Sequence, residues 1–297
     1  MTGIGDVLYE VDGVSKTYRG MIRAVNNVTL TVRVGDFIGV LGKNGSGKST
    51  LVKMMVGLVR PDTGRVSFLG ETLNGTPAAV GYMPQSGFAL NTLTVREALI
   101  VVSYLRGLSW SAARLEASKL LEDFEIGSYA DRVANRLSGG ERRMLQIAVC
   151  MAGSPPVLIL DEPTNELDIG RRKLIWSHLR QIHKEGRTIV LITHNALEAD
   201  RYIDSVLIMK EGRLKALNSL SDLRRADTFD LKVRFRSETI VNLGVTTPMR
   251  ISDVDYEYEV LVHSSEVGDV LERLRASGVD EVWVTPVTLE DLYERLA

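Results

Sequence analysis

The chain alternates between short runs of consecutive apolar residues and longer segments in which apolar residues recur every three or four positions. The apolar runs lie at residues 37–41, 157–160, 188–192 and 206–209. Such runs are typical of strands that are buried on both faces of a parallel sheet. Segments with helical spacing separate them, for example at residues 49–58 and 171–184. This alternation predicts an α/β fold with a mostly parallel sheet that helices cover on both faces.

A long helical stretch interrupts the alternation between about residues 88 and 155. Thr94 precedes Glu97 by three positions, which is the spacing of a capping box at the start of a helix. Further helical patterns follow at residues 111–124 and after Ser138. We therefore predict an inserted helical subdomain over residues 88–155.

The pattern changes again after residue 225. Strands are expected at residues 229–236, 256–262 and 281–285, and helices at 265–276 and 288–296. Thr288 is the expected cap of the last helix, with Asp291 three residues later. The prediction is a large domain at residues 1–225 and a small α+β domain at residues 226–297.

Composition narrows the class of protein. The 297 residues have a formal net charge of −2. The chain therefore lacks the overall positive charge that is typical of proteins whose main role is binding nucleic acid. The one cysteine, Cys150, excludes an internal disulfide and lies in an apolar run, so we expect a buried side chain rather than a nucleophile. The sequence has neither a signal-peptide pattern nor an apolar run of about 18 residues, so a role at a membrane would need a partner protein.

A glycine-rich turn with the spacing G-x-x-x-x-G-K-S follows the apolar run at residues 37–41. It consists of Gly42, Lys43, Asn44, Gly45, Ser46, Gly47, Lys48 and Ser49. Glycines allow a tight turn whose N–H groups, with the N-terminus of the next helix, form an anion site. We expect Lys48 to reach nucleotide phosphates, Ser49 to hold Mg²⁺, and Thr50 to complete the ATP-binding set. The alternative is a turn without a ligand, which the strand before it and the helix after it disfavour.

Two carboxylates, Asp161 and Glu162, directly follow the apolar run at residues 157–160. Parallel sheets bind ligands at the carboxyl ends of their strands. We expect Asp161 to hold Mg²⁺ and Glu162 to orient or deprotonate the attacking water. Taken alone, the pair could equally be a solvated turn, and the phosphate loop favours the functional interpretation.

The run Leu137, Ser138, Gly139, Gly140 and Glu141, about twenty residues before the Asp-Glu pair, resembles the signature motif of the ABC ATPase family. The resemblance covers roughly residues 7–225 and includes the family's motifs in order. It implies a P-loop NTPase core with an antiparallel β subdomain and an inserted helical subdomain. It also implies hydrolysis of ATP with Mg²⁺.

The resemblance assigns further roles residue by residue. Tyr18 matches the aromatic residue that stacks on adenine, and Gln85 the glutamine that senses Mg²⁺ and the attacking water. The signature residues 137–141 match the loop that covers the γ-phosphate bound to the opposite subunit. Asp168 matches the aspartate between the subunits, and His194 the histidine at the γ-phosphate. The alternatives are an exposed aromatic for Tyr18, a structural histidine for His194 and a plain loop residue for Gln85.

A physical argument supports the pairing of two copies of this chain as a dimer. Ser138 begins a helix, and a Ser-Gly-Gly backbone at a helix start is a second anion site. One chain thus has two half-sites for phosphate, which two copies placed head to tail would complete.

The sequence also departs from the family pattern. The family usually has glutamine in place of Glu141, and small residues are commoner at Asn165 and Glu166. We expect Glu141 to point to solvent or to pair with Arg142. The other histidines, His178, His183 and His263, lack the spacing of metal ligands, and we expect them at the surface.

The resemblance implies an ATP-hydrolysing subunit on the inner face of the cell membrane, paired with a second ATPase subunit and a separate membrane permease. Residues 88–105 are the candidate contact with the permease. The ending at residues 286–296 resembles ABC ATPases of the drug- and antibiotic-exporter type, so we expect export of a drug-like or amphipathic compound. Alternatives are an importer subunit, an ABC ATPase without a transporter, and a small P-loop kinase, which would leave the signature loop unexplained.

Overall fold

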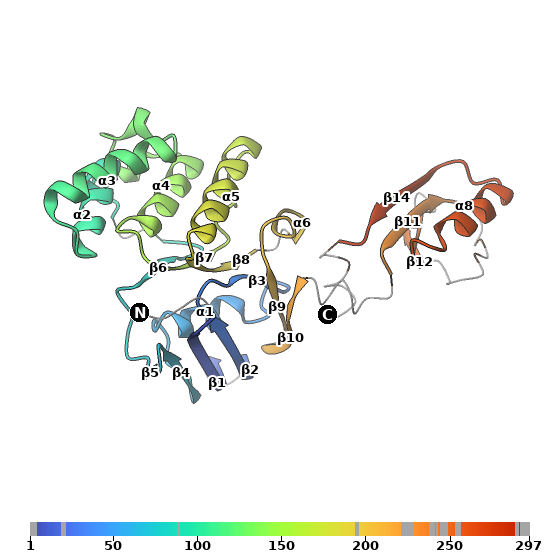
Figure 1. Ribbon diagram of the computed structural model, residues 1–297, viewed down its shortest axis with the longest axis horizontal. Helices are drawn as coiled ribbons and strands as arrows, with labels where there is room; N and C mark the ends of the chain where they lie inside the picture. Colours follow the sequence, from blue (N-terminus) through green and yellow to red (C-terminus); the bar gives the residue numbers. More distant parts are fainter. Residues whose placement is uncertain are drawn as a thin grey trace. The chain divides into compact units, whose positions relative to one another are not determined.

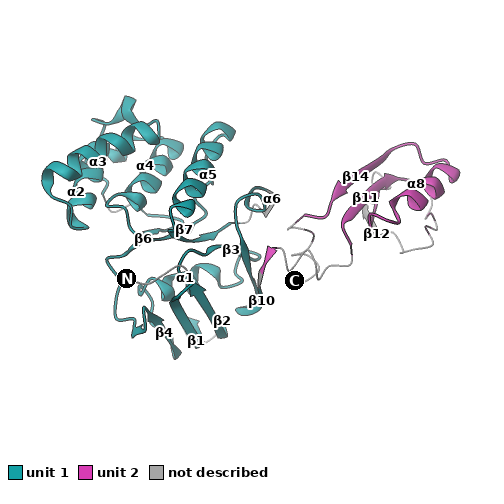
Figure 2. Cartoon of the chain, in the orientation of Figure 1, with its two compact units in different colours: residues 1–217, 297 teal, residues 218–296 magenta. Residues whose placement is uncertain are grey.

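The computed structural model describes residues 5–18, 22–87, 90–193, 196–220, 229–237, 241, 243, 249–252, 257–288 and 291. These residues form two compact units, one up to Leu217 and the other from Asn218 onward (Figure 2). The boundary predicted at residue 225 falls within residues 221–228, which are outside the described part of the chain.

A six-stranded sheet forms the centre of the first unit, in the order β10-β9-β3-β8-β7-β6 (Figure 1). The five strands β9, β3, β8, β7 and β6 run parallel to one another. Their bounds are β3 (Phe37–Leu41), β6 (Val80–Met83), β7 (Val157–Asp161), β8 (Thr188–Ile192), β9 (Ser205–Lys210), with β10 (Arg213–Ser219) beside β9. All residues of β3, β7 and β8 are buried, as their continuous apolar runs predict.

A separate antiparallel sheet has the order β2-β1-β4-β5. It contains β1 (Val7–Tyr18), β2 (Ile22–Arg33), β4 (Thr63–Phe68) and β5 (Glu71–Thr72). The first two strands are 12 residues long each, and their pairing continues through several shifts of register as far as Tyr18. The strand β4 was not predicted, and its first three residues are exposed.

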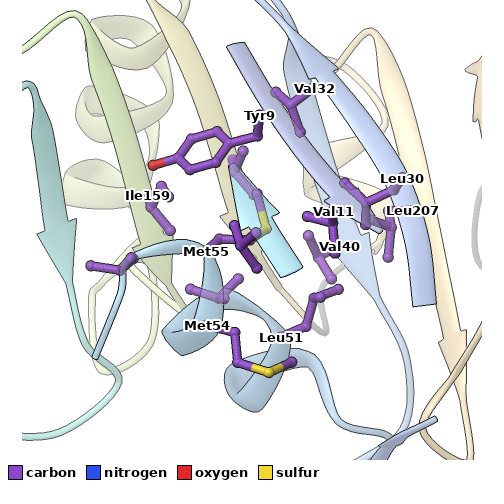
Figure 3. Packing of buried hydrophobic residues seen from close by; sticks show 14 of the residues in the cluster. Tyr9, Val11, Leu30, Val32, Val40, Leu51, Met54, Met55, Ile159 and Leu207 are labelled. Atoms are coloured by element: carbon purple, nitrogen blue, oxygen red, sulfur yellow. The ribbon is translucent and has the colours of Figure 1, made fainter. Parts of the chain in front are cut away.

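The helix α1 (Lys48–Met55) lies between the two sheets. Tyr9 and Leu30 from the antiparallel sheet, Leu51 and Met55 from α1, and Ile159 from β7 belong to one buried cluster (Figure 3). Each large apolar side chain that is fully buried contributes about 1.5–3 kcal/mol. This core therefore holds the phosphate loop, which directly precedes α1, between the two sheets.

Helices lie on the other side of the six-stranded sheet from α1 (Figure 1). They are α2 (Val95–Leu105), α3 (Trp110–Asp123), α4 (Gly139–Met151) and α5 (Ile169–Lys184), with short helical turns η1 (Gly127–Tyr129) and η2 (Ala134–Arg136) and the short helix α6 (Ala196–Ala199). The predicted capping box of Thr94 and Glu97 is present at the start of α2. Three of these helices, α2 to α4, lie in the chain between β6 and β7, which agrees with a helical insertion into the α/β fold.

The second unit has a four-stranded antiparallel sheet in the order β12-β13-β11-β14. Its elements are β11 (Leu231–Arg236), β12 (Met249–Ser252), β13 (Glu257–Val262), α8 (Val267–Ala276) and β14 (Val282–Pro286). Val233, Phe235, Tyr258, Val270 and Leu274 belong to its core. Strand β12 was not predicted; the other strands and α8 lie within two residues of their expected bounds.

The sequence prediction was wrong about two of the histidines. His178 stacks on Phe124, and its Nε2 lies 2.6 Å from the carbonyl of Asp123. His183 Nε2 lies 2.8 Å from the carbonyl of Gly35. Both rings are half-buried and bind backbone, which a local pattern cannot reveal.

Cys150 is buried and free, as expected. Among the described residues, no helix has the length and apolar character needed to cross a bilayer.

Candidate nucleotide-binding site

The loop between β3 and α1 is shaped by glycines. Gly47 has φ 101°, and a Cβ added to it would lie 2.1 Å from the carbonyl oxygen of Ala24 in β2. A Cβ on Gly42 would lie 2.4 Å from Ser46 Oγ and 2.5 Å from the carbonyl oxygen of Met209. Only glycine fits at these two positions, because real Cβ contacts are never this short. The phosphate loop is therefore tightly enclosed by β2 and β9.

Lys48, the first residue of α1, is buried beside the loop. Its Nζ donates to the carbonyl oxygens of Gly42 at 2.7 Å and Lys43 at 3.1 Å. Burial lowers the pKa of Lys48, and the nearby carboxylates of Glu162 and Asp161 oppose that shift. A cation held at the N-terminus of a helix, with loop N–H groups around it, is suited to bind phosphate.

A pocket of about 550 Å³ extends from this loop to the ends of β6 and β7. The predicted residues that line it are Tyr18, Asn44, Gly45, Gly47, Lys48, Ser49, Thr50, Gln85, Asp161 and Glu162. Sequence reasoning missed Ile22, Arg23, Ala24, Ile192 and Glu211. The predicted loop residues Gly42, Lys43 and Ser46 shape the loop without lining the pocket.

The hairpin between β1 and β2 explains part of this omission. Its register places Tyr18 opposite Ile22 and Thr17 opposite Arg23. Tyr18 and Ile22 are both exposed, so they present apolar surface at the mouth of the pocket. The signal that would have found Ile22 and Arg23 is the pairing register, which apolar periodicity alone does not supply.

Asp161 ends β7 and is only 1% exposed. Neither carboxylate oxygen has a hydrogen-bond partner among the residues that the structure describes. Burial raises the pKa of Asp161, while Ser49, Lys53 and Lys48 counteract the shift. A buried carboxylate with free oxygens, beside a serine hydroxyl, is a hard-oxygen donor set of the kind that Mg²⁺ binds. The residues present therefore fit a magnesium ion.

Glu162 follows with φ 54°, an uncommon conformation for a residue other than glycine. It is 5% exposed, and its N–H donates to the carbonyl oxygen of Ile192 at 2.9 Å. This bond to β8 and the left-handed backbone turn the chain at the end of β7, where Glu162 lines the pocket. Strained residues of this kind are typical of functional sites.

Gln85 lies two residues beyond β6 and also lines the pocket. The structure thus brings Gln85, Asp161, Glu162 and Lys48 together around one cavity. His194, the remaining predicted catalytic residue, lies outside the described residues.

The signature residues form the start of α4. Ser138 Oγ accepts the N–H of Glu141 at 3.3 Å, and Glu141 Oε2 accepts the N–H of Ser138 at 2.9 Å, a complete capping box. None of residues 137–141 lines the pocket.

The expected pairing of Glu141 with Arg142 was wrong. Both carboxylate oxygens of Glu141 lie 3.1 Å from Arg132 Nη1. Successive residues of a helix point about 100° apart, so Arg142 turns away and donates instead to the carbonyl of Leu137 at 3.3 Å. The negative charge that Glu141 adds at the signature is therefore compensated by Arg132.

Asp168, the predicted subunit-interface residue, is the N-cap of α5. Its side chain accepts the N–H of Arg171 at 3.0 Å, and this bond lowers the pKa of Asp168. The neighbouring Glu166 reaches the signature loop, since a Cβ added to Gly139 would lie 2.9 Å from Glu166 Oε2. The segment around Asp168 and the signature are thus neighbours within one chain.

Comparison with known proteins finds relatives whose names describe ATP-binding proteins. The family model described as ABC transporter matches residues 25–165. The Nod factor export ATP-binding protein I of Burkholderia orbicola is 40% identical over 193 residues, which are 64% of each protein. The matched region is thus less than two thirds of that relative's length. The daunorubicin/doxorubicin resistance ATP-binding protein DrrA of Streptomyces peucetius is 34% identical over 80% of this chain and 76% of its own.

Solved structures resemble the chain as well. A dimeric ATP-binding cassette, MJ0796, in a post-hydrolysis state with ADP and Pi, has a TM-score of 0.67 and 26% identity. The match covers 72% of this chain and 99% of that one. An ATP-binding subunit of an ABC transporter has a TM-score of 0.68 and 29% identity, over 73% of this chain and 92% of its own.

Proposed function

Because this chain belongs to the ABC transporter family of ATP-binding proteins, we propose that it binds and hydrolyses ATP to energise a transporter. The observation that carries the proposal is the separation of two phosphate half-sites on one chain. The pocket holds Lys48 and Glu162, whereas the signature at Ser138 lies outside it. Two copies placed head to tail would complete each pocket with the partner's signature.

Within one pocket, the chain supplies binding and proton chemistry. Tyr18 stacks on the adenine, and the loop N–H groups with Lys48 hold the β- and γ-phosphates. Glu162 accepts a hydrogen bond from the attacking water and aligns it with the γ-phosphorus. Gln85 contacts the same water, and His194 is proposed at the γ-phosphate.

Ser49, Asp161 and Gln85 are the residues that would hold Mg²⁺. When bound, the ion neutralises the charge of the β- and γ-phosphates. Asp161 is suited to this role because its oxygens are buried without a direct partner among the described residues.

The partner subunit's signature is proposed to cover the γ-phosphate through the Ser138 hydroxyl and the Gly139 and Gly140 amides. The Ser138 hydroxyl would donate a hydrogen bond to the phosphate while its oxygen accepts the N–H of Glu141. Asp168 is proposed to lie at the same interface. The solved dimer of a similar cassette bound to ADP and Pi supports closure around nucleotide.

The transport role rests on the relatives and on an exposed surface. The names of two relatives refer to Nod factor export and to daunorubicin/doxorubicin resistance, which supports export of an amphipathic compound. Tyr104 and Leu105 at the end of α2 and Trp110 and Leu115 of α3 are all at least half exposed. Large exposed apolar side chains are typical of protein contacts. They favour this end of the helical insertion as the contact for a permease on the inner face of the membrane.

The test is the pair of variants Glu162→Gln and Glu125→Gln. Both residues have positive φ, at 54° and 55°, but only Glu162 lines the pocket. We expect Glu162→Gln to lower ATP turnover by about 100-fold or more while ATP binding is retained. It should also trap dimers with ATP in size-exclusion chromatography, whereas Glu125→Gln should form them only transiently.

Turnover of Glu125→Gln should stay within a few-fold of the unmodified chain. Equal turnover in Glu162→Gln and the unmodified chain would contradict the proposed role of Glu162. Full activity as a monomer would contradict the proposed dimer.

A further inference from the structure

A buried guanidinium links the parts of the candidate site. Arg143 is on α4, five residues after Ser138, and is only 6% exposed. Its Nη1 donates to the carbonyl oxygen of Gln85 at 3.0 Å. Its Nη2 and Nε donate to the carbonyls of Asp161 at 3.2 Å, Glu162, and Pro163 at 3.3 Å. One side chain therefore joins α4 to the segment after β6 and the segment after β7.

Burying this charge is costly unless it is compensated. Desolvation lowers the pKa of Arg143, while the carboxylates of Glu166, Asp161 and Glu162 oppose that shift. The planar guanidinium has five N–H donors in a fixed arrangement, and the carbonyls around it use that arrangement. Lysine has a single nitrogen and cannot reach both segments at once.

The hydrogen bond from Arg143 to the carbonyl of Glu162 holds the backbone of that residue in place. With φ 54°, the backbone of Glu162 is strained, and such strain persists only where surrounding contacts hold it. Arg143 bonds the carbonyl of Glu162 and the carbonyls on either side, at Asp161 and Pro163. These bonds fix the backbone from which the Glu162 side chain enters the pocket.

The same arginine is tied to the signature through its own helix. Ser138 caps α4, and a helix of 13 residues transmits displacement as a rigid rod. Movement of the helix start is therefore transmitted to Gln85 and Glu162 through the hydrogen bonds of Arg143.

We propose that Arg143 is a positioning residue that makes the signature half-site and the water-orienting half-site of one chain a single rigid body. In the dimer, contact of Ser138 with a partner's nucleotide would then align Glu162 on the chain's own nucleotide. The two pockets would be coupled through Arg143. This inference rests on the proposed function, because it assumes that Glu162 orients water and that Ser138 acts across the interface.

The chain offers a matched control at the other end of α4. Arg106 Nη1 donates to the carbonyls of Cys150 at 2.8 Å, Val149 at 3.4 Å and Ala152. Among the described residues, the hydrogen bonds of Arg106 go to these backbone carbonyls and not to Gln85 or Glu162. Replacing either arginine by lysine disturbs bonds to backbone carbonyls. Arg106 makes its bonds from Nη1 alone, whereas Arg143 uses three nitrogens, and only the replacement of Arg143 acts on the candidate site.

The experiment compares Arg143→Lys with Arg106→Lys in the full chain. Both should lower the melting temperature. Arg143→Lys should also lower kcat at least tenfold with the Kd for ATP changed less than threefold. The Hill coefficient for ATP should fall toward 1. Arg106→Lys should keep kcat within twofold and keep the Hill coefficient.

A milder variant keeps the inference testable if Arg143→Lys folds poorly. Gln146 Oε1 accepts from Arg143 Nη1 at 3.2 Å, and Gln146 is partly exposed. Gln146→Ala should fold and should lower kcat in the same direction by a smaller factor, about twofold to fivefold.

Amide hydrogen exchange without nucleotide separates failure of the inference from failure of the proposed function. Residues 84–87 and 161–165 should exchange faster in Arg143→Lys and not in Arg106→Lys. An unmodified chain without ATPase activity would refute the proposed function, and the exchange difference would still test the rigid link. Exchange, kcat and Hill coefficient that are the same in both arginine variants would overturn the inference.

Discussion

The position that most sharply tests the shape of the phosphate loop is Gly47. A Cβ there would lie 2.1 Å from the carbonyl oxygen of Ala24 and 3.2 Å from the Met209 methyl carbon. The nearer obstacle is backbone of β2, which is paired with β1 and cannot move alone. Gly45 is the matched control, since it has φ 81° but nothing within 4 Å of an added Cβ.

The magnitude follows from two contributions. A left-handed backbone costs an alanine about 1 kcal/mol relative to glycine. Gly45→Ala should therefore lower the free energy of unfolding by about 1 kcal/mol. Gly47→Ala adds overpacking against a rigid strand, which costs about 2 kcal/mol more. The total is about 3 kcal/mol, and the difference of about 2 kcal/mol corresponds to roughly a 30-fold change in the unfolding equilibrium.

The assay is urea unfolding followed by tryptophan fluorescence in a Trp283→Phe background. The two remaining tryptophans, Trp110 and Trp176, then report on the first unit alone. Binding of ATP is measured in parallel by titration. We expect Gly47→Ala to weaken ATP binding at least tenfold, because β2, which lines the pocket through Ile22 and Arg23, must move away from the loop.

The comparison between the two glycines decides the outcome. Equal losses of stability in Gly45→Ala and Gly47→Ala would refute the argument that β2 closes over the loop. Unchanged ATP binding in Gly47→Ala would refute the inference that the loop and the β1–β2 hairpin form one binding surface.

Three further outcomes are expected. Asp161→Asn should abolish Mg²⁺-dependent turnover and yet raise the melting temperature, because it removes a desolvated carboxylate whose pKa burial raises. In the second unit, burial alone would raise the pKa of Asp291, but hydrogen bonds from Lys232 and Thr288 outweigh it and lower that pKa. The stability that Asp291 adds to this unit is therefore fully present above the unfolded pKa of about 3.9 and is lost as pH falls through the lower folded pKa. Acid titration followed by circular dichroism, with Asp291→Asn as the comparison, would measure this loss. Burial raises the pKa of Cys150 to about 12, so a thiol reagent at pH 8 should react only at the rate of unfolding.

Local patterns were sufficient to predict the elements that a local cause determines. The strands β3, β7 and β8 are buried on both faces, so their sequences are uninterrupted apolar runs. The capping box at Thr94 is made by residues three positions apart. In the phosphate loop, Gly42 and Gly47 stand where an added side chain would collide with neighbouring atoms. In each case the residue type that the structure requires is found at the position where the physical constraint acts.

Other features depend on contacts between distant segments. Strand β4 begins with three exposed residues and acquires its structure by pairing with β1. Arg132 compensates Glu141 across nine positions because a turn brings it back to the start of α4. His183 bonds the carbonyl of Gly35, 148 positions away. Periodicity within a window has no information about such partners.

Arg143 shows why charged residues on helices are the hardest to interpret. In the sequence it is one of two adjacent arginines, Arg142 and Arg143, and such a pair usually lies on a solvated helix face. The helical rotation of about 100° separates them, so one turns toward the ends of β6 and β7 and the other does not. Apart from Gln146 of its own helix, the partners of the buried arginine among the described residues are backbone carbonyls. A carbonyl is supplied by every residue type, so no side chain in the partner segments marks the interaction in advance.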